Sequence, residues 1–243
     1  MIVSITIFLA IIFVFSAAGS RIIKQKNSNI ENFVISACIG LFVLSIVVFV
    51  IGALGMLYRW VFVVLIILCF VISYKEATGI ISHFVSRLRM IGRIFPSRFE
   101  RFLIVIFVIV GIASLIETLA PEIGNDALAY HLAHPKVFVQ MHKIAAIEYA
   151  RESLWPYFTE MLFTLQGQAL AKLFHFGSAI LLSLGIYAFG SRYFSRISGL
   201  LAATIFFATP AIFTQAGYAY IDIMVALYAF MSLYLFLAWR DSK

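Results

Sequence analysis

The sequence is poor in charged residues, and this scarcity already excludes an ordinary soluble domain. Only 12% of the 243 residues are charged, whereas 63% are hydrophobic. Soluble domains carry about 25% charged residues, so a soluble fold of this size could not bury so much apolar surface. Cysteine is also scarce. Cys38 and Cys69 both lie in apolar runs, and their spacing supports neither a disulfide framework nor a CxxC metal site.

The apolar residues come in long runs rather than in an alternating pattern. An apolar run of about 18 or more residues indicates a membrane-spanning helix, because a helix rises about 1.5 Å per residue through a core of about 30 Å. Helices also satisfy their own backbone hydrogen bonds in lipid. We therefore predict an all-α, polytopic transmembrane helical bundle of about seven spans, at residues 2–18, 33–57, 59–74, 102–120, 168–190, 198–215 and 221–239.

Basic residues lie in alternate connections between the predicted spans, and this alternation predicts the orientation. The basic segments are 19–32, 75–101, 191–197 and the C-terminal tail. Positively charged loops stay in the cytoplasm, so we place these segments inside and the long connection 121–167 outside. The net charge of +7 therefore reports topology and does not indicate nucleic-acid binding. No basic residue precedes the first apolar run, which favours a span over a signal peptide.

The external connection 121–167 is long and polar, and we expect it to carry short helices and the chemistry. Asn125 or Asp126 can cap such a helix, on which Asp126, Tyr130 and His134 fall at i, i+4 and i+8 and share a face. His131 lies one step round. A carboxylate beside an imidazole and a phenol can act as a general base, whereas the alternative is a polar interfacial helix. Zinc binding by His131 and His134 lacks any supporting HExxH pattern.

Asp222 is a second candidate, and the topology puts it on the same side of the membrane as Asp126. Ionisable residues at membrane depth are costly and are functional candidates by default. The two acids can hold a divalent cation or flank a polar acceptor; alternatively, Asp222 caps the helix 223–239. We expect Glu160 to face the same cavity. Lys172 either meets a lipid phosphate or extends toward the headgroups, and we favour the headgroups.

An ordered series of motifs resembles the GT-C membrane glycosyltransferases. Residues 125–136, which include Asp126, Tyr130 and His131, are similar to the first external loop of one branch of that family. This branch includes the 4-amino-4-deoxy-L-arabinose transferase-like and protein O-mannosyltransferase-like enzymes. Later stretches extend the resemblance, at residues 152–156, 192–195, 199–203, 209–210 and 218–222.

The resemblance covers about residues 101–243 and divides the chain into two parts. Residues 1–100 form an N-terminal three-span addition plus the segment 75–101, whose apolar stripe beside arginines is typical of a cytoplasmic amphipathic helix on anionic headgroups. Residues 101–243 form the GT-C-like membrane region. Family members usually continue with further helices, so we expect an N-terminal portion whose missing helices come from further sequence or from a second polypeptide.

The resemblance implies transfer of a sugar from a polyprenyl-phosphate donor to a lipid, glycan or protein acceptor, on the external (periplasmic) face of the inner membrane. Asp126 matches the loop acid that activates the acceptor. Asp222 resembles a second acid that in some members helps to hold a divalent cation, which makes Asp126 and Asp222 candidate metal ligands. The candidate substrate-binding residues are Tyr130, His131, His134, Glu160 and Lys172.

Two other classes of function stay open. A transporter or flippase for a lipid-linked glycan would also use intramembrane acids, although such proteins more naturally show paired repeats and broken helices near the middle of the membrane. The other alternative is a non-catalytic membrane accessory subunit, a role that is compatible with a shortened relative of a transferase.

Overall fold

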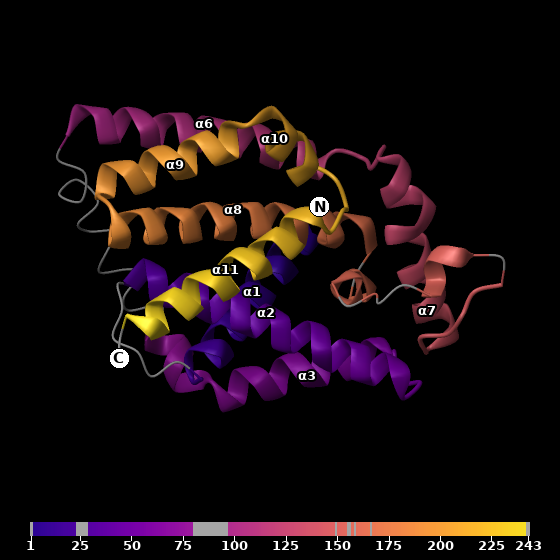
Figure 1. Cartoon of the computed structure of the whole chain (residues 1–243). Helices are drawn as coiled ribbons and strands as arrows, with labels where there is room; N and C mark the ends of the chain where they lie inside the picture. Colours follow the sequence, from indigo (N-terminus) through magenta and orange to yellow (C-terminus); the bar gives the residue numbers. More distant parts are fainter. Residues whose placement is uncertain are drawn as a thin grey trace.

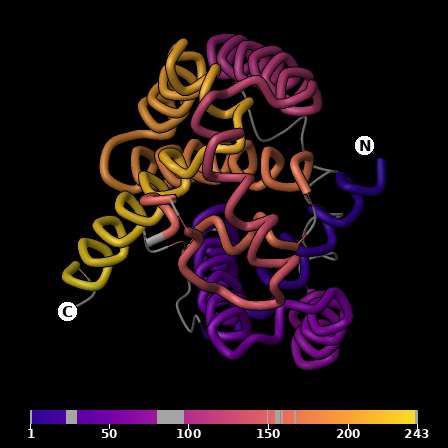
Figure 2. Tube along the Cα trace, turned by 90° about the vertical axis from the view of Figure 1, so that its right-hand side faces the viewer, coloured from indigo at the N-terminus to yellow at the C-terminus, as the bar shows by residue number. Residues whose placement is uncertain are grey.

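The computed structural model describes residues 2–22, 29–79, 97–148, 150–154, 157, 159–165 and 167–241. Within these residues, every regular element is a helix. The long helices lie side by side in one bundle, and the connection between α6 (Arg98–Leu119) and α8 (Gly167–Tyr193) lies across one end of it (Figure 1 and Figure 2). The predicted all-α class is confirmed for the described part of the chain.

Five helices are long and apolar enough to cross a membrane, namely α1 (Ile2–Ser20), α2 (Asn29–Ala53), α6, α8 and α11 (Asp222–Arg240). A sixth candidate joins α9 (Arg196–Ala208) to α10 (Pro210–Ala216), but the two are bent by 66°. Pro210 explains the bend, because the residue before a proline is pushed into an extended conformation, as Thr209 is here. These helices are compatible with an integral membrane protein.

The predicted number of seven spans is not confirmed, for two reasons. One is the bent pair α9 and α10, and the other is α3 (Arg59–Ile72). This helix is apolar but has only 14 residues, whereas a span needs about 20. The sequence pattern extended it to residue 74, but the helix ends at the Ser73 cap.

Glycine allows the closest helix pairs to form. A Cβ atom on Gly40 would lie 1.9 Å from the carbonyl oxygen of Phe15, and one on Gly19 would lie 2.1 Å from a carbonyl oxygen of α2. A Cβ atom on Gly190 of α8 would lie 2.5 Å from Cα of Gly199 on α9. Small residues let membrane helices approach backbone to backbone, so α1 packs on α2 and α8 on α9 through these positions.

Helix α8 is the centre of the bundle. It contacts α1, α2, α6, α9 and α11. In its most apolar stretch, 72% of the residues are buried, whereas only 17% are buried in the corresponding stretch of α6. Helix α6 therefore lies at the periphery with its apolar side chains outward, as expected of a lipid-facing helix. Both α8 and α2 contact the connection between α6 and α8, through η3 (Glu160–Thr164).

One end of the bundle is held together by ion pairs. Arg192 at the end of α8 pairs with the buried Glu31 of α2 at 2.6 Å, and Arg196 at the start of α9 pairs with the buried Glu100 of α6 at 3.2 Å. These pairs bring the ends of four helices together. We call this end the basic end.

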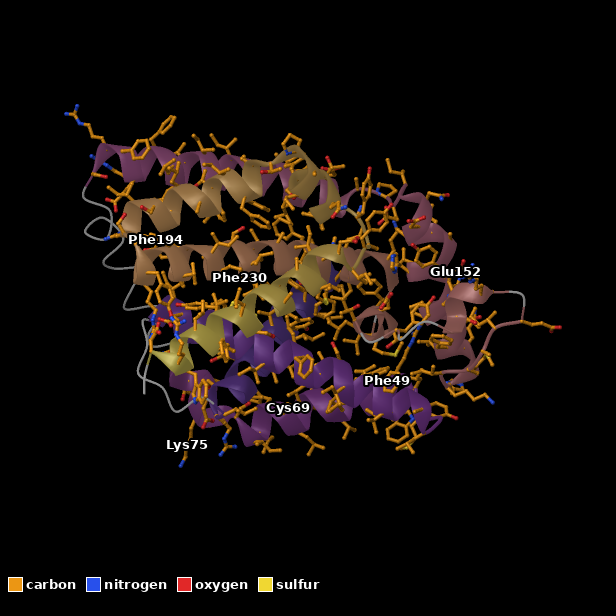
Figure 3. The ribbon with its side chains drawn as sticks, viewed as in Figure 1. Phe49, Cys69, Lys75, Glu152, Phe194 and Phe230 are labelled. Carbon is orange, nitrogen blue, oxygen red and sulfur yellow. The ribbon has the colours of Figure 1, made fainter. Side chains whose placement is uncertain are left out.

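A third pair places the end of α1 at the basic end as well. Arg21 pairs with Glu76 at 3.2 Å. Figure 3 shows Lys75 and Phe194 at this end and Glu152 at the opposite one. The described parts of the basic segments therefore gather at one end of the bundle, as the predicted alternation requires.

The predicted amphipathic helix 75–101 lies mostly outside the described residues, since these omit 80–96. Its last residues belong to α6 instead. The Ser97 hydroxyl accepts from the Glu100 N–H at 3.0 Å, and the Glu100 carboxylate accepts from the Ser97 N–H at 3.2 Å. This reciprocal cap begins the helix at Arg98, four residues before the predicted start of the span.

Candidate functional site

The connection between α6 and α8 forms the end of the bundle opposite the basic end (Figure 1 and Figure 2). Its elements are short: the π-helix η1 (Ala127–His131), α7 (Ala133–Met141), and the 3-10 helices η2 (Arg151–Leu154) and η3 (Glu160–Thr164). The prediction that this connection carries short helices is confirmed. We call this end, with the turn 217–221 before α11, the loop end.

The loop end begins at Glu122, whose buried carboxylate accepts three backbone hydrogen bonds. Oε1 accepts from the N–H of Ile123 at 2.9 Å and of Gly124 at 2.8 Å, and Oε2 accepts from the N–H of Ala219 at 2.7 Å. Ala219 lies in the turn 217–221. Glu122 thus connects the start of the loop segment to the turn that leads into α11.

Asp126 is exposed and lies at the start of η1, where its side chain makes no capping bond. Tyr130 lies one turn later, and burial followed by its interaction with the Asp126 side chain raises the pKa of Tyr130 to about 12. Burial followed by the charge of Asp126 also raises the pKa of Tyr220. The Asp126 carboxylate therefore lies beside two phenols that stay protonated at neutral pH.

Asp222 is exposed and belongs to the first turn of α11. Its charge contributes to the raised pKa of Tyr130, which places it in electrostatic range of the Asp126 pair. The expectation that Asp222 caps the helix is wrong, because the N-cap is Ile221 and makes no side-chain cap bond. The Ile223 N–H instead donates to Nε2 of a histidine on α8, at 3.2 Å.

That histidine is His175, which is fully buried. Its Nδ1 lies 2.9 Å from the carbonyl oxygens of both Gln215 and Tyr218. Since Nε2 accepts from Ile223, the proton must be on Nδ1, and the ring is the neutral tautomer. His175 therefore fastens both sides of the turn 217–221 to α8 and fixes where α11 begins.

His131 and Glu160 are both buried and form a pair. Nδ1 of His131 lies 3.1 Å from Oε1 of Glu160, and the Thr159 hydroxyl donates to Oε2 at 3.0 Å. The His131 ring lies next to the rings of Tyr130 and Tyr220, with centroid distances of 4.3 Å and 5.8 Å. Two predicted substrate-binding residues are thus partners of each other, beside the two phenols.

His134 is directed to Tyr157 rather than to Asp126. Its Nδ1 is hydrogen-bonded to the Tyr157 hydroxyl, both side chains are buried, and burial lowers the pKa of His134. The predicted shared face holds for Asp126 and Tyr130 but not for His134. The reason is the π-turn: the Leu132 N–H bonds to the Ala127 carbonyl, five residues back, and the extra residue rotates the side chains after it to another face.

Lys172 is buried, and its ammonium donates to the carbonyls of Glu117 at 3.2 Å and Ala120 at 2.8 Å. These carbonyls lie at the C-terminal end of α6, where a cation is favourable, and the Glu117 carbonyl also accepts from the Ala120 N–H at 3.1 Å. The expectation that Lys172 extends toward the headgroups is wrong, because the carbonyls at the end of α6 hold it inside. A role in binding substrate stays a prediction.

The described residues contain no group of three or more His, Cys, Asp or Glu side chains placed to hold a metal ion. His131 and His134 use Nδ1 for different partners, so they do not act as a ligand pair there. Asp126 and Asp222 would supply only two protein ligands, so a divalent cation there would need water or substrate oxygens in its remaining positions. Such sites are typical of Mg²⁺ bound with substrate phosphate.

Comparison with known proteins gives no family. No protein-family model, curated protein or solved structure matches this chain. The function must therefore be argued from the site, because a fold by itself does not specify chemistry.

The sequence reasoning missed Glu122. It considered His175 together with Lys172, as a cation for a lipid phosphate or for the headgroups, and did not predict that His175 holds the turn 217–221. His175 offered a signal, since an ionisable residue in the middle of an apolar run has to find polar partners inside the bundle. Glu122 offered none. A single glutamate beside a proline and before a glycine resembles any exposed loop acid, and its third partner lies 97 residues away.

Proposed function

We propose that the protein is a membrane glycosyltransferase of the GT-C type, or the N-terminal part of one. It moves a sugar from a polyprenyl-phosphate donor to an acceptor on the external face of the inner membrane. The observation that carries this proposal is the exposed Asp126 carboxylate at the loop end, whose charge acts on both Tyr130 and Tyr220, with the charge of Asp222 also acting on Tyr130. The resemblance of residues 101–243 to this family agrees with it.

The reaction needs a base within reach of an acceptor hydroxyl. In an inverting transfer the acceptor oxygen bonds to the anomeric carbon, the bond from that carbon to the phosphate oxygen breaks, and the phosphate leaves with the electron pair. The proton of the acceptor hydroxyl passes to Asp126, which is exposed and oriented by Tyr130. The raised pKa of Tyr130 keeps this phenol a donor and not a competing base.

A divalent cation, when bound by Asp126 and Asp222, would stabilise the charge on the leaving phosphate. Its protein ligands would be Asp222, at the start of α11, and Asp126, at the start of η1. Tyr130, beside the His131–Glu160 pair, would contact the acceptor or donor head group at the same end of the bundle.

The external placement of the site follows from the positive-inside rule applied to the basic end. Reporter fusions near residue 90 and at the C-terminus should report cytoplasm, and a fusion near residue 140 should report the outside. A cytoplasmic signal near residue 140 would contradict the proposed external site, since it would move Asp126 and Asp222 to the wrong face.

Sugar transfer itself is tested in membranes of the native host, where any partner polypeptide is present. Membranes from a deletion strain and from the restored strain receive polyprenyl-phosphate-linked hexose and pentose donors with labelled sugar. We expect label to move from donor lipid to acceptor only in the restored membranes. Equal transfer with and without the protein, for each donor, would contradict the proposed function.

A further inference from the structure

The carboxylate of Glu122 binds two segments of the loop end, residues 121–126 and residues 217–221. Glu122 is only 7% exposed, and its oxygens accept from Ile123 and Gly124 on one side and from Ala219 on the other. A carboxylate offers about four acceptor positions, so backbone N–H groups occupy most of them. Charge-assisted bonds of this kind are stronger than bonds between neutral groups.

Each side of this carboxylate leads directly to one of the candidate acids. Asp126 lies two residues after Gly124, and Asp222 lies three residues after Ala219. Tyr220, which follows Ala219, lies against the other segment, since its hydroxyl is 3.2 Å from the position that a Cβ atom on Gly124 would take. Displacing either segment, 121–126 or 217–221, from Glu122 would therefore change the distance between the two acids.

Gly124 favours this close arrangement. A Cβ atom at this position would lie 3.0 Å from Oε1 of Glu122 and 3.2 Å from the Tyr220 hydroxyl. Glycine lets the backbone approach both groups at once, so the N–H of residue 124 reaches the carboxylate while the Tyr220 ring lies against it.

We propose that Glu122 is a positioning residue that fixes Asp126 and Asp222 relative to each other across the site. The effect of Glu122 on catalysis rests on the proposed function, whereas its effect on the two segments does not. Glu122 touches no reacting atom and acts through the backbone of both segments.

Both the two acceptor oxygens and the length of the glutamate side chain are needed, and each requirement gives a variant. Glu122→Gln has one oxygen and an amide NH₂, so one segment loses its acceptor and meets a donor instead. Glu122→Asp keeps the charge but is one methylene shorter. It can still accept from Ile123 and Gly124 but not from Ala219.

Amide hydrogen exchange of the full chain in lipid nanodiscs measures this directly. In Glu122→Gln, exchange should become roughly tenfold faster or more in at least one of the segments 121–126 and 217–221. In Glu122→Asp, only 217–221 should change. The matched control is Glu100→Gln, which alters an equally buried acid at the basic end and should leave both segments unchanged. Unchanged exchange at 217–221 in both Glu122 variants would overturn the proposal.

Sugar transfer in native membranes separates positioning from general destabilisation. Glu122→Gln should lower kcat roughly 10- to 100-fold and leave the KM for the lipid-linked donor within about twofold, because misplacing reacting groups slows chemistry more than binding. Glu100→Gln should keep kcat. Faster exchange at 217–221 with normal kcat would overturn the positioning role. Exchange is measured without substrate, so absent transfer by wild type would contradict the proposed function and leave the exchange result standing.

Discussion

Replacing His175 tests how firmly the turn before α11 is held. His175→Ala removes three contacts at once, to the carbonyls of Gln215 and Tyr218 and to the N–H of Ile223. The Gln215 carbonyl still accepts from the N–H groups of Gly217 and Tyr218. Among the described residues, the Tyr218 carbonyl and the Ile223 N–H keep no other hydrogen-bond partner.

The cost follows from those two groups. An unsatisfied buried polar group costs about 1–3 kcal/mol, so His175→Ala should lower the free energy of unfolding by about 2–6 kcal/mol, before any cavity cost. His175→Asn keeps a side-chain N–H near the position of Nδ1 but no acceptor at the position of Nε2. It should therefore recover about half of that loss.

Equilibrium unfolding in mixed micelles with increasing SDS measures these differences. The matched control is Ser178→Ala, one turn further along α8, whose buried hydroxyl bonds only to the Phe174 carbonyl of its own helix. We expect the control to change the free energy of unfolding by less than about 1 kcal/mol. A cost below about 1 kcal/mol for His175→Ala, or equal costs for Ala and Asn, would refute the reasoning.

Two further predictions concern packing and pH. Gly40→Ala should destabilise the protein by about 1–3 kcal/mol or more, because its Cβ would lie 1.9 Å from the Phe15 carbonyl oxygen. Gly111→Ala, whose Cβ would lie 3.5 Å from a Phe207 ring carbon, should be nearly neutral in the same SDS titration. Burial lowers the pKa of His134, so the unfolded chain binds that proton more readily and stability should be lost as pH falls below the ordinary value of 6.5. Melting temperatures at about pH 7.5 and 5.5 should differ less in His134→Asn, and an unchanged difference would contradict this.

The fold was predictable where the signal is local. Apolar runs mark the long helices because each spanning helix must satisfy the bilayer by itself. The number of spans was less predictable, because hydropathy does not register the bend that Pro210 imposes between α9 and α10 or the early end of α3 at Ser73. The basic segments were assigned correctly to one end wherever the structure describes them.

The site was predictable only within one turn of chain. Asp126 and Tyr130 are four residues apart and do meet, as helical spacing requires. The π-turn at 127–131 has no sequence signature, so His134 was assigned to the wrong face. The His131 partner of Glu160 and the Ala219 partner of Glu122 lie 29 and 97 residues away, and no spacing rule reaches that far.

The most direct test of the account is sugar transfer by Asp126→Asn in native membranes. Asparagine keeps the shape of the side chain but cannot take a proton. We expect turnover of the polyprenyl-phosphate-linked donor to fall by about 10²–10⁴-fold, with expression and membrane insertion unchanged. The control Asp241→Asn removes an exposed acid at the basic end and should turn over normally. Near-normal turnover by Asp126→Asn would contradict the assignment of Asp126 as the base.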